Sequence, residues 1–425
     1  MSISSPNILP ITSINANRLL ATCPACGLLC DDILIDVNEQ NVRVLNTKCY
    51  KSIQFFEQVS SYASPQINGN PATLNDAIEH AASLLKNSQA PLFAGLSTDV
   101  QGFRSIYNIT QKSNASLQHI NNQSLARNME VLQSAGWQTT TFTEVKNRAD
   151  VIVCFGDVAT HNPRFFERFV DCDGLFISAK NRQIILIGNN TVQNTVESDT
   201  TGLKHASVSL DDAFLLPCRA DDLPLITIAL RALVAEKALK ATQIAGINLS
   251  DLQIVADKLK AAKYAVLAWV AKDFDFNHAQ LSIQNITETV AILNQTTRAA
   301  GLPLGGSDGD TTVNNVNTWL NGSTLDISGL TLENDAIEHD CMVWVNSFST
   351  DKMPLNSDHP LIVLGHSKSR FAKTPDVFIP IATPGLDCSG TLFRVDSAVI
   401  LPLKKVRENT LPTLRKVVSE IEKLI

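Results

Sequence analysis

Four cysteines near the N-terminus have the type and spacing of a metal centre. Cys23, Cys26 and Cys30 form a C-x2-C-x3-C run, and Cys49 follows with eighteen residues in between. Three thiolates on one tight loop with a distant fourth are typical of a cubane iron–sulfur cluster, which takes four cysteine ligands. Zinc also accepts four cysteines, but more often from two C-x2-C pairs, and a second pair is missing here. A set of reduced cysteines without metal is the third alternative, and we favour the cluster.

The stretch before Cys49 predicts how this cysteine returns to the other three. Asp32–Val37 alternates charged and apolar residues, Asn38–Asn41 is turn-forming, and Val42–Leu45 has the pattern of a second short strand. A hairpin of that size brings its two ends together. We therefore expect Cys49 to lie beside the Cys23–Cys30 loop, so that four thiolates surround one centre.

The rest of the chain has the pattern of an α/β protein. From residue 70 onward, short apolar runs alternate with helical patterns. The runs that we expect to be strands are Pro91–Gly95, Val151–Gly156, Ile184–Gly188, Ala265–Val270, Met342–Val345 and Leu361–Gly365. Apolar residues recur at helical spacing in Asn75–Lys86 and Gln280–Leu293. Continuously apolar strands are covered on both faces, so they indicate parallel sheets flanked by helices.

Composition and charge exclude several classes of function. The chain has 425 residues, a net charge of −7 and a pI near 5.6, without a long basic run, which is a poor match to a nucleic-acid or anionic-membrane binder. The longest apolar candidate, Tyr264–Ala271, is too short to cross a membrane. Met1–Asn17 contains no Lys or Arg and predicts no export signal. Nine sparse cysteines then suit the cytoplasm, where they are thiols or metal ligands.

The cysteine run belongs to a longer resemblance. Cys23–Asp32 (CPACGLLCDD) closely resembles the opening of the B subunit of formylmethanofuran dehydrogenase, a molybdopterin oxidoreductase. The resemblance continues, in the same order, in Glu144–Val153, His161–Arg164, Val316–Gly322 and Asp376–Gly390, and so covers nearly the whole chain.

The resemblance implies a molybdopterin-oxidoreductase-like α/β fold with two doubly wound domains. The expected parts are an N-terminal cysteine and β-hairpin module (1–63), a discontinuous first α/β domain (64–146 with 334–385), an inserted second α/β domain (147–333), and a C-terminal segment with a docking helix (386–425).

Archaeal members of this family carry the four-cysteine cluster and a tungsten or molybdenum bis-pterin cofactor, and they interconvert carbon dioxide and formate. Their metal ligand is a cysteine or selenocysteine at a position that falls at or near Ser124. No cysteine exists between Cys49 and Cys154, so the thiolate for the redox metal is missing. A serine oxygen ligates molybdenum in other branches of the superfamily. Ser124 reads equally as the cap of a helix running through Leu132, which we favour.

The chain matches the family along nearly its whole length but lacks the metal ligand. In this combination it resembles the B subunit of the bacterial formyltransferase/hydrolase complex. That complex serves tetrahydromethanopterin-linked oxidation of formaldehyde to formate. The resemblance implies a non-catalytic structural subunit without molybdopterin or tungstopterin. Its partners would be a formyltransferase, an amidohydrolase-like hydrolase and a small glutamate-synthase-like subunit. The alternative is an active molybdenum or tungsten oxidoreductase that uses Ser124.

His161-Asn-Pro-Arg164 follows an expected strand, at the end where α/β sheets bind ligands. Arg164 could hold a pterin phosphate through two hydrogen bonds. Alternatively the segment starts a helix, with Asn162 as its cap and Pro163 in the first position. We expect the helix start in either case.

Three further features have structural interpretations. Gly301–Asp310 is rich in glycine but lacks the spacing of a phosphate-binding motif, so we expect a plain loop. Cys154 should be a small buried core residue, and Cys388 is too isolated for a metal site. The last sixteen residues should form a helix with Pro412 in its first turn. Its apolar stripe, from Leu414 to Ile425, should dock on the chain's own core or on a partner subunit, and we favour the chain's own core.

Overall fold

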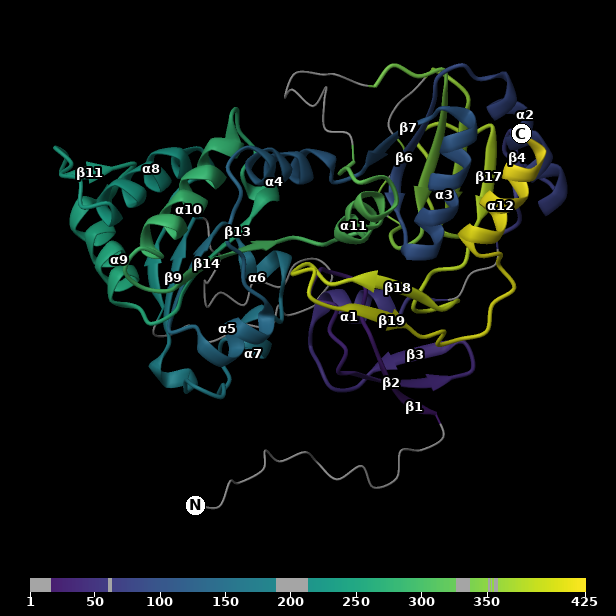
Figure 1. Ribbon diagram of the computed structural model, residues 1–425. Coiled ribbons are helices and arrows are strands. Elements are labelled where there is room, and N and C mark those ends of the chain that lie inside the picture. Colours follow the sequence, from purple (N-terminus) through teal and green to yellow (C-terminus); the bar gives the residue numbers. More distant parts are fainter. Residues whose placement is uncertain are drawn as a thin grey trace.

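We describe a computed structural model of the chain (Figure 1). The structure describes residues 17–59, 63–188, 213–325, 337–350, 352, 354 and 358–425. The stretch considered as an export signal, Met1–Asn17, lies outside these residues except for Asn17. Within the described ranges, no helix is long and apolar enough to cross a membrane.

The N-terminal module is a three-stranded antiparallel sheet followed by a short helix. Its strands are β1 (Arg18–Ala21), β2 (Ile33–Asn38) and β3 (Asn41–Val44), in the order β1-β2-β3, and its helix is α1 (Tyr50–Phe56). Alternating residues of the hairpin point inward, and Ile33, Ile35 and Phe56 are almost fully buried. The predicted hairpin between Cys30 and Cys49 is therefore confirmed.

The larger α/β body contains a seven-stranded sheet in the order β5-β4-β17-β16-β15-β6-β7. The strands β17, β16, β15, β6 and β7 are parallel, and the β4–β5 hairpin adds an antiparallel edge. The bounds are β4 (Gln66–Ile67), β5 (Asn70–Pro71), β6 (Pro91–Ser97), β7 (Ser116–His119), β15 (Cys341–Asn346), β16 (Leu361–Gly365) and β17 (Val377–Pro380). The three strands predicted here are confirmed. Each is completely buried because helices and loops cover the sheet.

Four helices accompany this sheet: α2 (Leu74–Asn87), α3 (Val100–Ser113), α11 (Asp310–Asn321) and the C-terminal α12 (Leu414–Leu424). The α12 helix packs against α2 and α3 (Figure 1). Its stripe residues Val417, Val418 and Ile421 are at most 2% exposed, so docking on the chain's own core is confirmed. The predicted start is wrong. Thr413 caps the helix by accepting from the Lys416 N–H, and Pro412 precedes the cap.

A second sheet of five parallel strands has the order β10-β9-β8-β13-β14. Its bounds are β8 (Val151–Phe155), β9 (Gln183–Ile187), β10 (Phe214–Leu216), β13 (Ala265–Val270) and β14 (Ala299–Leu304). One face is covered by α8 (Leu223–Val234), α9 (Leu249–Ala261) and α10 (Ala279–Leu293), and the other by α5 (Phe142–Arg148), α6 (Val158–His161) and α7 (Phe165–Phe169) (Figure 1). The three predicted strands of this sheet and its predicted helix Gln280–Leu293 are confirmed.

The remaining elements connect these layers. They are α4 (Asn122–Ser134), β11 (Gln243–Ile244), β12 (Ile247–Asn248), a ribbon of β18 (Gly390–Phe393) and β19 (Ile400–Leu403), and the 3-10 turns Ala179–Asn181, Ala220–Asp222 and Ala271–Asp273. The β18–β19 ribbon lies between the N-terminal module and the seven-stranded body (Figure 1). Leu29 of the cysteine loop packs with Leu392 and Leu403 of this ribbon.

In the sequence, some strands of the seven-stranded sheet precede all strands of the five-stranded sheet, and the others follow them. Near the expected limits, α4 packs on α10 of the second sheet, whereas α11 packs on α3 of the first. The division into 64–146 with 334–385 and an inserted 147–333 remains a proposal.

Candidate functional site

The four cysteines of the N-terminal module surround one small cavity. Its lining consists of Cys23, Cys26, Leu28, Cys30, Cys49, Lys51, Ser52 and Arg164. All four cysteines are buried and unpaired. As the side chains stand, no three histidine, cysteine, aspartate or glutamate residues among those described are grouped to hold one metal ion. The four thiols border one space without converging on a single point.

Local backbone geometry places three of these thiols on one loop. The Cys23 N–H donates to the Cys30 carbonyl at 2.9 Å, which closes the loop between β1 and β2. The Leu29 N–H donates to the Cys26 carbonyl at 3.2 Å, and Leu29 adopts a left-handed φ of 43°. The fourth thiol, on Cys49, stands at the N-terminal cap of α1. The hairpin and helix start thus deliver the fourth cysteine as the sequence predicted.

Burial raises the pKa values of three of these thiols, on Cys23, Cys26 and Cys30. It raises the pKa of Cys26 to about 12, and neighbouring cysteines add to the effect at Cys23 and Cys26. The Ser52 hydroxyl opposes this slightly by donating to the Cys23 sulfur at 3.4 Å. Protonated thiols are poor nucleophiles, so the arrangement does not suit cysteine-based covalent catalysis. A bound cation would supply the charge that stabilises the thiolates.

Arg164 lines the cysteine cavity, and its guanidinium binds carboxylates. It donates to both carboxylate oxygens of Asp32, at 2.7 and 2.9 Å, and to both oxygens of Glu167, at 2.8 and 3.2 Å. The predicted helix start is wrong in detail. Asn162 closes α6, Pro163 lies between the helices, and Arg164 occupies the N-terminal cap position of α7.

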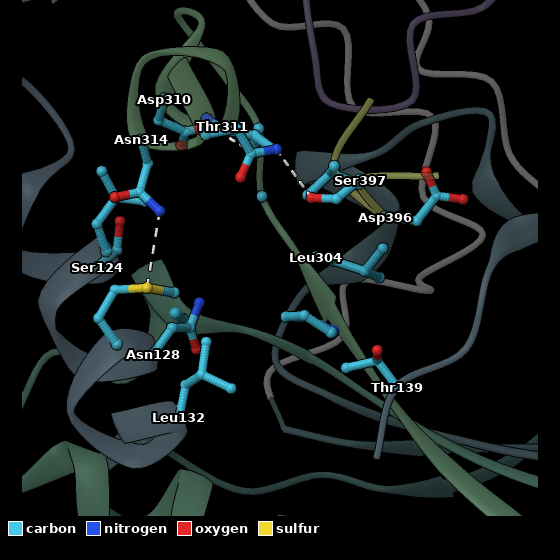
Figure 2. A pocket seen from close by; sticks show the side chains of 18 of the residues that line it. Ser124, Asn128, Leu132, Thr139, Leu304, Asp310, Thr311, Asn314, Asp396 and Ser397 are labelled. Carbon is cyan, nitrogen blue, oxygen red and sulfur yellow. Dashed lines mark hydrogen bonds between the residues drawn. The ribbon is translucent and has the colours of Figure 1, made fainter. Parts of the chain in front are cut away.

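A second cavity, of about 360 Å³, lies between α4, the loop after β14 and the β18–β19 connection (Figure 2). Figure 2 shows Ser124 and Asn314 on one wall and Ser397 on the other. The Asn315 amide donates to the Ser397 hydroxyl at 3.0 Å across part of this space. Lys272 is the basic side chain among the described lining residues.

Ser124 lines this second cavity but is not a helix cap. The α4 helix begins at Asn122, and Asn121 occupies the cap position. Ser124 therefore lies in the first turn, where its hydroxyl donates to the Asn121 carbonyl at 2.9 Å. The prediction of a cap at Ser124 is wrong, because the helix starts two residues earlier. Its hydroxyl hydrogen is used within the helix.

The glycine-rich segment has a packing role that sequence reasoning missed. Gly301 and Leu304 belong to β14, and the following turn leads into α11. Gly305 and Gly306 line the second cavity and also press against Gly27 in the cysteine loop. The Gly305–Gly306 wall of the second cavity therefore packs directly against the cysteine loop. The small residues in both segments were the available signal, but sequence alone does not pair them.

The residues do not fit a pterin-bound redox metal. Ser124 offers a hydroxyl in place of a thiolate, and Arg164 already binds two carboxylates. After β8, where an α/β sheet receives phosphate, the Asp273 carboxylate accepts from the Asp157 N–H and lies near Gly156. A phosphate there would meet the carboxylates of Asp157 and Asp273, and Arg219 is the arginine that lines the cavity at this end of the strands. Asn162 is an observation in favour of a bound group, because its side-chain amide is fully buried without a hydrogen-bond partner.

The remaining predicted residues have structural environments. Cys154 lies within β8 with no exposed surface, as predicted. The Cys388 thiol donates weakly to the Ala382 carbonyl at 3.7 Å. His161, which the sequence places beside Arg164, contacts Asp273 through its Nε2 atom at 2.7 Å.

Sequence comparison confirms the expected resemblance over nearly the whole chain. The chain is 25% identical over 416 residues to the B subunit of the tungsten-containing formylmethanofuran dehydrogenase 2 of Methanococcus maripaludis, covering 90% of this chain and 92% of that protein. The protein of the same name from Methanocaldococcus jannaschii is 25% identical over 418 residues, with the same coverage. The B subunit of the formyltransferase/hydrolase complex of Methylorubrum extorquens is 35% identical over 91 residues, or 21% of this chain and 25% of that one. No family model matches the chain.

Structural comparison identifies the fold. A chain in the crystal structure of the formyltransferase/hydrolase complex from Methylorubrum extorquens with methylofuran matches with a TM-score of 0.68 and 21% identity, covering 85% of this chain and 98% of that chain. Acetylene hydratase from Pelobacter acetylenicus matches with a TM-score of 0.64 and 8% identity, covering 95% of this chain and 69% of that chain. The chain has the molybdopterin-oxidoreductase-like α/β fold, as expected.

Proposed function

We propose that this chain, a homologue of the B subunits of formylmethanofuran dehydrogenase and of the formyltransferase/hydrolase complex, is a non-catalytic structural subunit of a formyltransferase/hydrolase-type complex. The complex would act in tetrahydromethanopterin-linked oxidation of formaldehyde to formate. Its other members would be a formyltransferase, an amidohydrolase-like hydrolase and a small glutamate-synthase-like subunit.

The environment of Ser124 is the observation on which this proposal depends. A molybdenum or tungsten ion in this family needs a strong ligand from the chain, and thiolate and serine oxygen differ in softness and charge. Here the hydroxyl hydrogen of Ser124 is held by the Asn121 carbonyl, at the wall of a cavity that no cysteine lines among the described residues. Loss of the thiolate that the family places near Ser124 would remove the redox metal and leave the fold intact.

The cysteine centre has a separate, structural role in this proposal. The four buried thiols border one space, which is the arrangement that a four-iron cluster fills. A zinc ion would instead draw all four sulfurs to about 2.3 Å from a single point. We therefore propose a [4Fe–4S] cluster that ties the loop between β1 and β2 to the start of α1. Such a centre, with nine thiols in the chain, suits the reducing cytoplasm.

Metal analysis of the assembled complex tests the proposal. The chain is co-expressed with its three proposed partners and purified anaerobically through a tag on the formyltransferase. Iron, zinc, molybdenum and tungsten are then measured by mass spectrometry. We expect the chain in stoichiometric amount with about four irons per chain, without molybdenum or tungsten.

Two results would contradict this function. Stoichiometric molybdenum or tungsten would support the active oxidoreductase and make Ser124 the candidate ligand. If circular dichroism shows that the chain is folded but the chain does not co-purify with its partners, the structural role would be wrong. An assay of formate oxidation with an artificial electron acceptor provides a second readout, and we expect no activity from this chain.

A further inference from the structure

We propose that Arg164 and Arg168 are positioning residues of the cysteine centre, which hold the Cys30 segment in place and compensate the negative charge of the metal–thiolate group. The inference rests on the cysteine centre of the proposed function. It gives a role to two arginines that lie more than a hundred residues away from the cysteines in sequence.

Arg164 links the cysteine loop to the body of the protein. Its side chain is 6% exposed and lines the cavity that the four cysteines surround. The guanidinium donates two hydrogen bonds, of 2.7 and 2.9 Å, to the carboxylate of Asp32, which lies two residues after Cys30. Glu167 accepts two more hydrogen bonds from the same group. The fixed fork of an arginine is suited to holding a carboxylate in one orientation.

Arg168 makes the parallel contact one residue earlier in the loop. It donates to the Asp31 carboxylate at 2.7 Å, and its Nε atom lies 3.7 Å from the Asp32 carboxylate. The guanidinium also lies near the Cys30 thiol, where its charge opposes the rise in the pKa of that thiol caused by burial. Arg168 is 18% exposed, whereas Asp31 is 55% exposed. The cation thus lies between the cysteine and an outer carboxylate.

Buried aromatic side chains anchor α7, which Arg164 precedes at the cap position and which contains Arg168. Phe165, Phe166 and Phe169 of α7 are buried, and the Phe169 ring stacks on Phe142 of α5 with ring centres 4.5 Å apart. The same apolar core continues into the N-terminal module through residues such as Ile33. The backbone that carries the two arginines is therefore held in place by close packing. Little backbone entropy is lost when their side chains bind the cysteine loop.

The electrostatic consequence follows from this geometry. Four thiolates around iron carry net negative charge, and a buried charge is stable only when opposite charge is near. Arg164 and Lys51 line the cavity and Arg168 lies beside Cys30, so these side chains supply positive charge around the thiols. The carboxylates that orient the two arginines are 43–55% exposed, so water screens their charge. Removing such a neighbour of a metal ligand commonly weakens metal binding by about 10–100-fold.

The first test measures how firmly the metal is held. Arg168→Gln, Arg168→Lys and Arg164→Gln are compared with the wild type in the assembled complex, with Arg148→Gln as control, because Arg148 pairs with Glu144 on the surface of α5. The readouts are iron per chain and the rate at which a chelator bleaches the cluster absorbance. We expect the two glutamine variants to lose iron about tenfold faster or more. Arg168→Lys should lie between them and the wild type, and the control should be unchanged.

A second variant separates electrostatics from a purely mechanical tie. Asp31→Asn keeps an oxygen that can accept from Arg168 but removes one negative charge beside the centre. Charge compensation predicts slower loss of iron and a more positive reduction potential. A mechanical tie predicts faster loss. Asp36→Asn is the matched control, because Asp36 lies on the same hairpin and pairs with the exposed Arg18.

Three outcomes would overturn the inference. One is wild-type retention of iron in both glutamine variants. Another is faster iron loss from Asp31→Asn, which would overturn the charge compensation and leave only a mechanical tie. The third is a wild-type chain that holds no metal on its cysteines. Co-purification with the partners is measured on the same samples. If the arginine variants contradict this inference, co-purification still tests the proposed structural role separately.

Discussion

Gly27 of the cysteine loop packs against Gly306 of the loop after β14, and a Cβ atom on Gly27 would lie only 2.9 Å from the Gly306 Cα atom. The same atom would lie 2.2 Å from the Gly305 carbonyl oxygen. The Gly27 carbonyl in turn accepts a hydrogen bond of 3.0 Å from the Val395 N–H. Gly27 thus connects the cysteine module to both the five-stranded sheet and the β18–β19 ribbon.

The first prediction concerns this contact. Gly27→Ala should destabilise the chain by about 1–3 kcal/mol, because the added methyl group meets backbone that cannot rotate away. Gly305→Ala is the control, since a Cβ atom there would meet nothing within 4 Å. Urea unfolding followed by circular dichroism measures both. Equal stability of the two variants would show that the loops separate easily.

The second prediction concerns a buried ion pair that fixes the C-terminal segment. Arg407 donates to the Asp387 carboxylate at 2.7 Å and to the Gln58 carbonyl at 2.7 Å, and both charged side chains are at most 3% exposed. Arg407→Ala leaves a buried carboxylate without its partner, so we expect a loss of about 3–5 kcal/mol. Lys405→Ala removes a pair with the exposed Glu408 and should cost at most about 1 kcal/mol.

Thermal and urea unfolding of the two variants check this second prediction. A double variant, Asp387→Asn with Arg407→Gln, removes both charges and should recover part of the loss, since neither partner is then left as an isolated ion. No recovery would mean that the Gln58 contact of Arg407 contributes most of the stability.

The third prediction is a pH dependence due to His366. This side chain is 2% exposed, and burial lowers its pKa to about 4. Its Nδ1 atom accepts from the Lys368 N–H, and its Nε2 atom contacts the Gln58 side-chain oxygen at 2.7 Å. The unfolded chain binds this proton near pH 6.5 and the folded chain only near pH 4, so stability should fall as pH drops between these values.

The full effect of His366 amounts to about 3 kcal/mol. Urea unfolding of the wild type and of His366→Gln at pH 7.5, 5.5 and 4.5 measures it. The variant should show a smaller loss of stability over this range, because glutamine does not titrate. An identical slope in both proteins would assign the acid sensitivity to other groups.

The elements that sequence predicted well are those with local signals. The strand Ala265–Val270 was predicted to its exact bounds, because an unbroken apolar run can only be buried on both faces. The hairpin after Cys30 was predicted because its alternation and turn residues are adjacent in the chain. The convergence of Cys49 on the other cysteines followed from that hairpin alone.

The elements that sequence missed depend on distant partners. Arg164 finds Asp32 across 132 residues, and nothing in either segment indicates the other. Asn162 looked like a helix cap, but Asp157 caps a short helix that ends just before it, so the chain must turn before α7 starts. Ser124 looked like a cap because its residue type is common there, yet the backbone of α4 had already begun.

The last prediction concerns Ser124 itself. Ser124→Ala removes one hydrogen bond to the Asn121 carbonyl within the first turn of α4, and alanine is the better helix former. We expect stability within about 1 kcal/mol of the wild type and unchanged metal content, assembly and hydrolase activity of the complex. Ser52→Ala is the contrasting variant, because the Ser52 hydroxyl touches the Cys23 sulfur inside the cysteine cavity, and it should accelerate iron loss. If Ser124→Ala instead abolished a redox activity or released molybdenum or tungsten, the hydroxyl would be a metal ligand, and the structural role would be wrong.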